Sequence, residues 1–209
     1  MLFKILKVFG IIQNILPIST EKNITLDYYT GKWHQVGTSR STKLFGTGID
    51  YKNVSALYEL EFNNKINDTV LTVYNSGKNE NDKFTNISGY SYVIGTSQTK
   101  RKLHFDKVPV DGNYWIVKLG PAINKKYEYA IISGPLTNWF GTRFSLYVLA
   151  RNKKKYNKMY EEEVMEWCKN NNYKFFWNEY ISTVYTLQTW RTNLNFKRIL
   201  NQQAIERRH

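Results

Sequence analysis

The chain has 209 residues, a length that suits one domain with a substantial core rather than two domains. Hydrophobic residues make up 42% of it and aromatic residues 16%, which excludes disorder over most of the chain. The net charge of +13 comes mainly from scattered Lys rather than clustered Arg, so nucleic acid is not an expected partner, although this charge favours transient contact with an anionic membrane.

The first twenty residues combine early lysines with a short apolar run. Lys4 and Lys7 precede an apolar stretch from Val8 to Ile18 that is short for a membrane span and suits the apolar region of a signal peptide. We therefore predict a signal peptide over residues 1–20 and a protein that is secreted or lies in the lumen of a secretory or vacuolar compartment. A helix that stays attached and a membrane anchor are the alternatives.

Eight short runs rich in β-branched and aromatic residues follow, separated by turn formers such as Asp111-Gly112 and Gly134-Pro135. The runs are KWHQVGTS (32–39), SALYELEF (55–62), TVLTVYN (69–75), SGYSYVIG (88–95), RKLHFDKV (101–108), NYWIVKLG (113–120), KYEYAIIS (126–133) and RFSLYVLA (143–150). Short strands at regular spacing predict an all-β fold, either an antiparallel sandwich or a barrel.

The period then changes to that of a helix. Residues 152–173 carry apolar side chains near a spacing of 3.6, which predicts one α-helix packed outside the sheet. A short closing strand is expected within residues 174–187, and a basic tail occupies residues 188–209.

Few residues point to chemistry. Cys168 is the only cysteine, lies in the predicted helix and is expected to be a small buried residue, so no disulfide forms within one chain. The three histidines stand far apart without ligand spacing, and no nucleophile–base pair or phosphate loop occurs. We expect no metal, no cofactor and no catalytic residue.

Gly31 and Trp33 open the first strand, and Arg151 ends the last one. A Trp at this point can plug one end of a barrel, with the glycine letting the chain pass close beneath it. The planar guanidinium of Arg151 can lie across the indole and donate to loose carbonyl groups.

With Gly31, Trp33 and Arg151 in these places, the sequence resembles the lipocalin family over residues 27–187. Within that family it most resembles the bacterial outer-membrane lipocalins and apolipoprotein D. The resemblance implies an eight-stranded antiparallel up-and-down calycin β-barrel with one C-terminal α-helix packed outside. Gly31, Trp33, Tyr127 and Arg151 are its structural signature. The family's T-D-Y motif is reduced here to Tyr127, after two lysines. An unrelated sandwich with a buried Trp is the alternative.

Side-chain alternation indicates which residues line the barrel interior, if Arg151 faces the closed end. The predicted ligand-binding lining is Ala56, Tyr58, Leu60, Phe62, Val73, Asn75, Leu103, Phe105, Trp115, Val117, Tyr147 and Leu149. Small residues are expected to leave volume inside, namely Gly37, Ala56, Gly89 and Ser91. Such a lining suits a small hydrophobic ligand such as a fatty acid, lysolipid or sterol.

Aromatic residues also fall in two loops expected at the open end. They are Leu44 and Phe45 after the first strand, and Trp139 and Phe140 before the last. Large apolar side chains at loop tips contact something as a rule, so we expect them to cap the ligand, touch a membrane or meet another subunit. Simple packing within the loops is the alternative.

The leading interpretation is a carrier of a small hydrophobic ligand that protects membranes from oxidised lipid. A homo-oligomer that buries its aromatic mouth in a protein interface is the first alternative. A basic nucleic-acid-binding barrel is the second, and it predicts strongly salt-dependent DNA binding.

Overall fold

The computed structural model describes residues 18–45, 51–138, 141–173 and 179–183. Its main sheet contains eight long antiparallel strands, which are β1 (Gly31–Ser39), β2 (Lys52–Asn63), β3 (Asp68–Lys78), β4 (Phe84–Ile94), β5 (Ser97–Phe105), β6 (Gly112–Leu119), β9 (Tyr129–Asn138) and β10 (Gly141–Ala150). Each pairs with the next, and β10 pairs back with β1, which closes the sheet into a barrel. The predicted eight-stranded antiparallel up-and-down barrel is confirmed.

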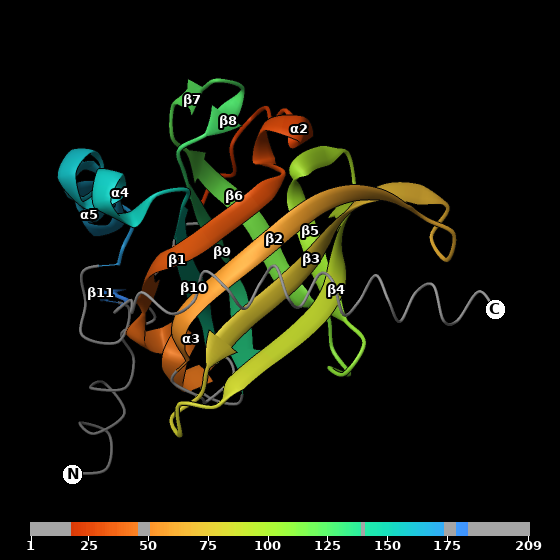
Figure 1. Cartoon of the computed structure of the whole chain (residues 1–209), viewed down its shortest axis with the longest axis horizontal. Coiled ribbons are helices and arrows are strands. Elements are labelled where there is room, and N and C mark those ends of the chain that lie inside the picture. The colour runs from red at the N-terminus through yellow and green to blue at the C-terminus, as the bar shows by residue number, and fades with distance from the viewer. Residues whose placement is uncertain (1–17, 46–50, 139–140, 174–178, 184–209) are drawn as a thin grey trace, which may run out of the picture.

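The two ends of the barrel are covered by different short elements (Figure 1). The helix α2 (Leu26–Tyr29) and the hairpin of β7 (Ala122–Ile123) and β8 (Lys126–Tyr127) lie at one end. The helix α3 (Arg40–Phe45) lies at the other, in the link between β1 and β2. The links after β1, β3, β5 and β9 therefore share the α3 end, which is the predicted open end.

Among the described residues that follow the barrel, two helices take the place of one continuous helix. The helix α4 (Lys153–Met159) begins after Asn152, whose side chain accepts a hydrogen bond from the backbone N–H of Lys155 at 3.0 Å. It ends at Tyr160, whose φ of −128° and ψ of −17° leave the helical region, and α5 (Glu161–Asn170) begins directly afterwards. The expected helix thus covers the predicted segment but is interrupted once.

The closing strand is present as β11 (Tyr180–Ser182). It pairs with Gly37–Ser39 of β1, whereas β2 pairs with the earlier part of that strand, Gly31–His34. The proposed boundaries of a signal peptide at 1–20 and a tail at 188–209 fall mostly or wholly outside the described residues and stay predictions.

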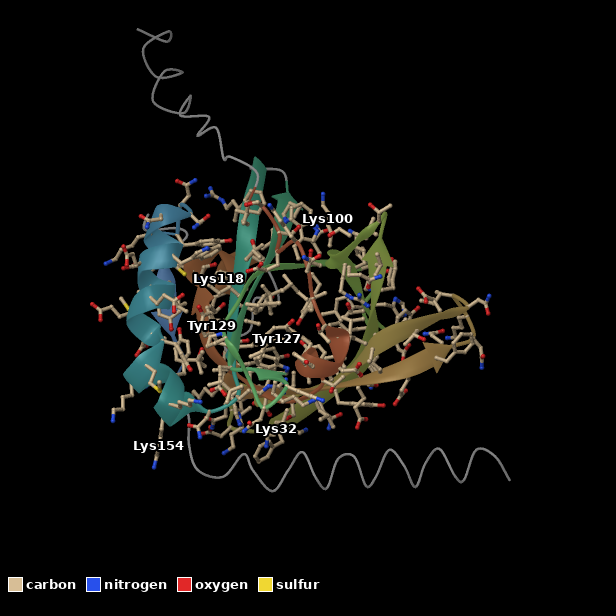
Figure 2. The ribbon with its side chains drawn as sticks, turned by 90° about the horizontal axis from the view of Figure 1, so that it is seen from above. Lys32, Lys100, Lys118, Tyr127, Tyr129 and Lys154 are labelled. Atoms are coloured by element: carbon tan, nitrogen blue, oxygen red, sulfur yellow. The ribbon has the colours of Figure 1, made fainter. Side chains whose placement is uncertain are left out.

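The apolar side chains form two separate layers. One fills the barrel interior around Trp33, Tyr58 and Ile132. The other lies between the barrel wall and the helices and includes Val148 and Val164. Figure 2 shows Lys118 and Tyr129 in this outer layer, facing α5, where the Lys118 amine and the Tyr129 hydroxyl contact the Glu163 carboxylate at 3.0 and 2.8 Å. Strands next to the helices therefore bury both of their faces.

Candidate ligand-binding site

The closed end is sealed by Trp33 and Arg151. The Trp33 side chain is fully buried and its indole N–H donates to the Tyr29 carbonyl at 2.7 Å. The Arg151 guanidinium carbon lies 3.8 Å from the centre of the Trp33 ring. The Arg151 N–H groups donate to the backbone carbonyls of Tyr28, Tyr29, Lys32 and Tyr127 over distances of 2.8 to 3.2 Å. The predicted contact between the two signature residues is confirmed.

Gly31 and Tyr127 complete this end in distinct ways. Gly31 has a φ of +97°, and a Cβ added there would lie 3.3 Å from Nη1 of Arg151, so the position favours glycine. The Tyr127 hydroxyl accepts from the Thr25 N–H at 3.0 Å. Next to it, the Lys126 amine donates to the Asp27 carbonyl at 2.8 Å and thereby ties the β7–β8 hairpin to α2.

Burial lowers the pKa of two basic side chains at or near this end. Burial lowers the pKa of Arg151 to about 10, still well above neutral pH, so its charge is retained. On the same strand as Trp33, burial and the neighbouring charge of Lys32 lower the pKa of His34 to about 4. Neutral His34 is therefore the form that the folded barrel accommodates.

His34 makes the stability of the barrel depend on pH. Unfolded His34 takes up a proton near pH 6.5, whereas folded His34 does so only near pH 4, so the unfolded chain binds more protons between these values. We expect the free energy of unfolding to fall by up to about 3 kcal/mol as the pH drops from 7 to 4. Urea unfolding of the wild type and of His34→Gln at several pH values measures this. The variant loses this part of the pH dependence, and parallel curves for the two proteins would contradict the prediction.

Three tyrosine hydroxyls form a chain in the barrel interior. The Tyr114 hydroxyl donates to that of Tyr58 at 2.9 Å, and the Tyr29 and Tyr114 hydroxyls lie 2.6 Å apart. All three side chains are buried. These linked hydroxyls were not predicted from the sequence. Tyr29 and Tyr114 were not assigned to the interior, and their separation of 85 residues gives no local signal.

Most of the predicted lining residues do lie on the interior side of the wall. Those in or against the interior cluster are Ala56, Tyr58, Leu60, Val73, Leu103, Phe105, Tyr147 and Leu149. Asn75 pairs with Ala56 and is half-buried, on the same alternation as Val73. Whether these side chains bind a ligand stays a prediction.

Three predicted lining residues lie elsewhere. Trp115 and Val117 belong to the outer layer, so their assignment to the interior is wrong. The inward residues of β6 are instead Tyr114 and Ile116, because the outer face of this strand is covered by the helices and is equally apolar. Phe62 is 61% exposed, because the end of the β2–β3 hairpin extends beyond the barrel.

The predicted small residues leave less interior volume than expected. A Cβ added at Gly37 would overlap the ring of Tyr180, which lies in the outer layer. A Cβ at Gly89 would overlap the backbone oxygen of His104 on the next strand, so this glycine serves close approach of two strands. Ser91 is covered by Arg101, whose Nε donates to its hydroxyl at 2.7 Å.

The half of the interior toward the open end is less tightly covered. Leu103, Phe105 and Tyr147 face inward and are only half-buried, whereas Trp33 at the closed end and Ile132, the cross-strand partner of Tyr147, are fully buried. Burial raises the pKa of the Tyr147 hydroxyl.

The side chains of the predicted mouth residues lie outside the part of the structure that is described. Trp139 and Phe140 lie outside the described residues, and so do the side chains of Leu44 and Phe45, whose backbone ends α3. Their predicted contacts with ligand, membrane or a second subunit stay predictions.

Groups suited to chemistry are few in the described part of the chain. No three His, Cys, Asp or Glu side chains within it gather as a metal site would require. Cys168 is buried in α5, and burial raises the pKa of its thiol to about 12, as expected for an inert structural residue. Across the same residues, no helix combines the length and apolar character needed to span a membrane.

A closed eight-stranded barrel, plugged at one end and lined by apolar residues toward the other, has an interior that is either filled by its own side chains or wide enough for one small ligand. Residues 19–199 match the family model described as "Lipocalin domain", so the chain belongs to the lipocalin family. No curated protein matches the chain. The resemblance to the lipocalin family that was predicted from the sequence is thereby confirmed.

Solved structures show the same fold at low sequence identity. Insecticyanin from the tobacco hornworm Manduca sexta is 17% identical, with a TM-score of 0.59 over 81% of this chain and 85% of that one. Lobster apocrustacyanin A1 is 15% identical, with a TM-score of 0.54 over 76% and 78%. H1 crustacyanin from the lobster Homarus americanus is 15% identical, with a TM-score of 0.57 over 85% and 86%.

Proposed function

We propose that this lipocalin binds and carries a small hydrophobic ligand inside its barrel. The observation that supports this most directly is the half-buried apolar lining of Leu103, Phe105 and Tyr147 above a fully buried plug. Burial of a 16-carbon chain contributes roughly 12 kcal/mol at about 0.8 kcal/mol per methylene, before the cost of immobilising it. Dissociation constants from micromolar to nanomolar follow.

Removing the upper lining tests this proposal. We expect Phe105→Ala with Tyr147→Ala to weaken binding of hexadecanoate at least about tenfold, because two large apolar contacts are lost. Displacement of a neutral fluorescent probe measures the affinity. The matched control is Tyr90→Ala. The Tyr90 ring packs at a tilt against His104 on the outer face of the wall, at a centroid distance of 4.9 Å. Equal affinity of wild type and double variant would contradict a ligand site in the barrel.

We further propose where this carrier acts and which ligand it removes. The motif order resembles that of the bacterial outer-membrane and apolipoprotein D type, so we place this carrier outside the cell or in a secretory lumen, where it removes oxidised lipid from membranes. Vesicles containing oxidised lipid should lose it to the protein. A stable oligomer on size-exclusion chromatography that takes up no lipid would favour the alternative of an aromatic protein interface.

A further inference from the structure

Arg101 is a fully buried cation on the interior face of the barrel wall. Its side chain is 0% exposed. It alternates along β5 with the outward Lys100, whose amine lies 4.6 Å from the centre of the outer Trp115 ring, and shares the face of Leu103. In the strand pairing Arg101 lies opposite Tyr114, which belongs to the interior cluster. Figure 2 labels Lys100 on this strand.

The protein gives this cation only neutral hydrogen-bond partners. Nε and Nη2 donate to the hydroxyl and carbonyl of Ser91, both at 2.7 Å, and Nη1 donates to the carbonyl of Gln98 at 3.3 Å. No ion pair within the described ranges includes Arg101; the carboxylate of Asp68, at the exposed start of β3, acts on it only at a distance. A buried charge without an opposite charge raises the free energy of the folded state, so an anion bound beside Arg101 would be stabilised.

The neighbouring phenols do not supply that anion. Burial raises the pKa of Tyr29 and Tyr114 well above the ordinary value and that of Tyr58 to about 12, so all three stay neutral. Neutral phenols can donate hydrogen bonds, and the Tyr114 and Tyr29 side chains lie within electrostatic range of Arg101.

One O–H group of the three linked tyrosine hydroxyls is left without a hydrogen-bond acceptor. Each phenol carries one O–H. Tyr114 donates to Tyr58, so the contact between Tyr29 and Tyr114 must use the proton of Tyr29. The proton of Tyr58 then has no acceptor among the described residues. A buried donor without an acceptor costs free energy that an incoming acceptor recovers.

The geometry points to a single-chain amphiphile bound with its anionic head group inward. We propose that the Tyr58 hydroxyl donates to the head group, that Arg101 supplies the opposing charge, and that the tail runs toward the open end past Leu103, Phe105 and Tyr147. This inference rests on the ligand-carrier function proposed above and names the class of ligand, a fatty acid or another alkyl anion.

The test compares two ligands with the same tail, hexadecanoate and the neutral hexadecanol. We expect the wild type to bind the acid at least about tenfold more tightly than the alcohol. Arg101→Met should reduce that ratio to about threefold or less and Tyr58→Phe should lower it severalfold, with alcohol binding retained in both. Lys100→Met, which removes a cation from the outer face of the same strand, should leave the ratio unchanged.

The outcomes separate this inference from the proposed function. An unchanged acid-to-alcohol ratio in both Arg101→Met and Tyr58→Phe would overturn the head-group site while leaving the carrier function intact. Failure of the wild type to bind either ligand would overturn the carrier function and the site together.

A measurement on the wild type alone covers the case in which Arg101→Met does not fold. Hexadecanoate labelled with ¹³C at the carboxyl carbon should keep a sharp resonance in the presence of a water-soluble gadolinium chelate. The same acid labelled at its terminal methyl should be broadened, because the tail end lies nearer the open mouth. The opposite pattern would show the head group at the mouth and overturn the proposal.

Discussion

Replacing Trp33 by alanine is expected to lower the free energy of unfolding by about 3–5 kcal/mol. The Trp33 side chain is fully buried, and its ring lies 5.0 Å from that of Tyr29, centroid to centroid. Removing it opens a cavity at the closed end and leaves the Arg151 guanidinium without its aromatic face. Urea unfolding followed by far-ultraviolet circular dichroism measures the change.

Two further variants separate the plug from a general loss of aromatic contacts. Trp33→Phe keeps a ring on Arg151 but loses the N–H bond to Tyr29, so we expect a smaller loss, about half that of alanine. Trp115→Ala removes a half-buried indole from the outer layer and should cost less than Trp33→Ala. If Trp33→Ala cost less than 1 kcal/mol, or less than Trp115→Ala, Trp33 would not be the plug.

The fold and its closed end could be predicted because their signals are local or chemically restrictive. Strand runs separated by turn residues fix the number of strands. The closed end has a restrictive signal, which is a Gly two residues before a Trp and an Arg at the end of the last strand. Few structures other than the observed packing of Arg151 on Trp33 use these residues together. The break at Tyr160 could not be predicted, since the helical spacing of apolar residues continues across it on both sides.

The interior was only partly predictable, for a reason that β6 illustrates. Tyr114, Trp115, Ile116 and Val117 are all apolar or aromatic, so alternation cannot tell the interior from the helix-covered face. A bulge between Ile116 and Lys118 shifts the register further along the strand.

Arg101 was missed for the opposite reason. It shares the alternation of Leu103 and Phe105, but a charged side chain is ordinarily assigned to solvent. Its neutral partners are Ser91 on the neighbouring strand β4 and Gln98 three residues earlier on β5 itself, and neither gives a sequence signal. When a charged residue falls on the same alternating face as apolar residues of its strand, that alternation therefore predicts its burial better than its charge does.

Replacing Arg151 by methionine is expected to lower the free energy of unfolding by about 3 kcal/mol. The change keeps an unbranched side chain comparable to the aliphatic part of arginine, but it leaves four backbone carbonyls without their donor. Arg151→Lys keeps the charge without the planar fork and should recover only part of this loss. Lys52→Met, which removes an exposed ion pair with Asp82, is the matched control and should change stability by less than about 0.5 kcal/mol.

A double-mutant cycle then tests whether the plug acts as a unit. If Arg151 stabilises the barrel partly through the Trp33 ring, Trp33→Ala with Arg151→Met should cost about 1–2 kcal/mol less than the sum of the single changes. Strictly additive losses would mean that Arg151 acts only through the carbonyl groups. The cation and the indole would then be neighbours that stabilise the closed end independently.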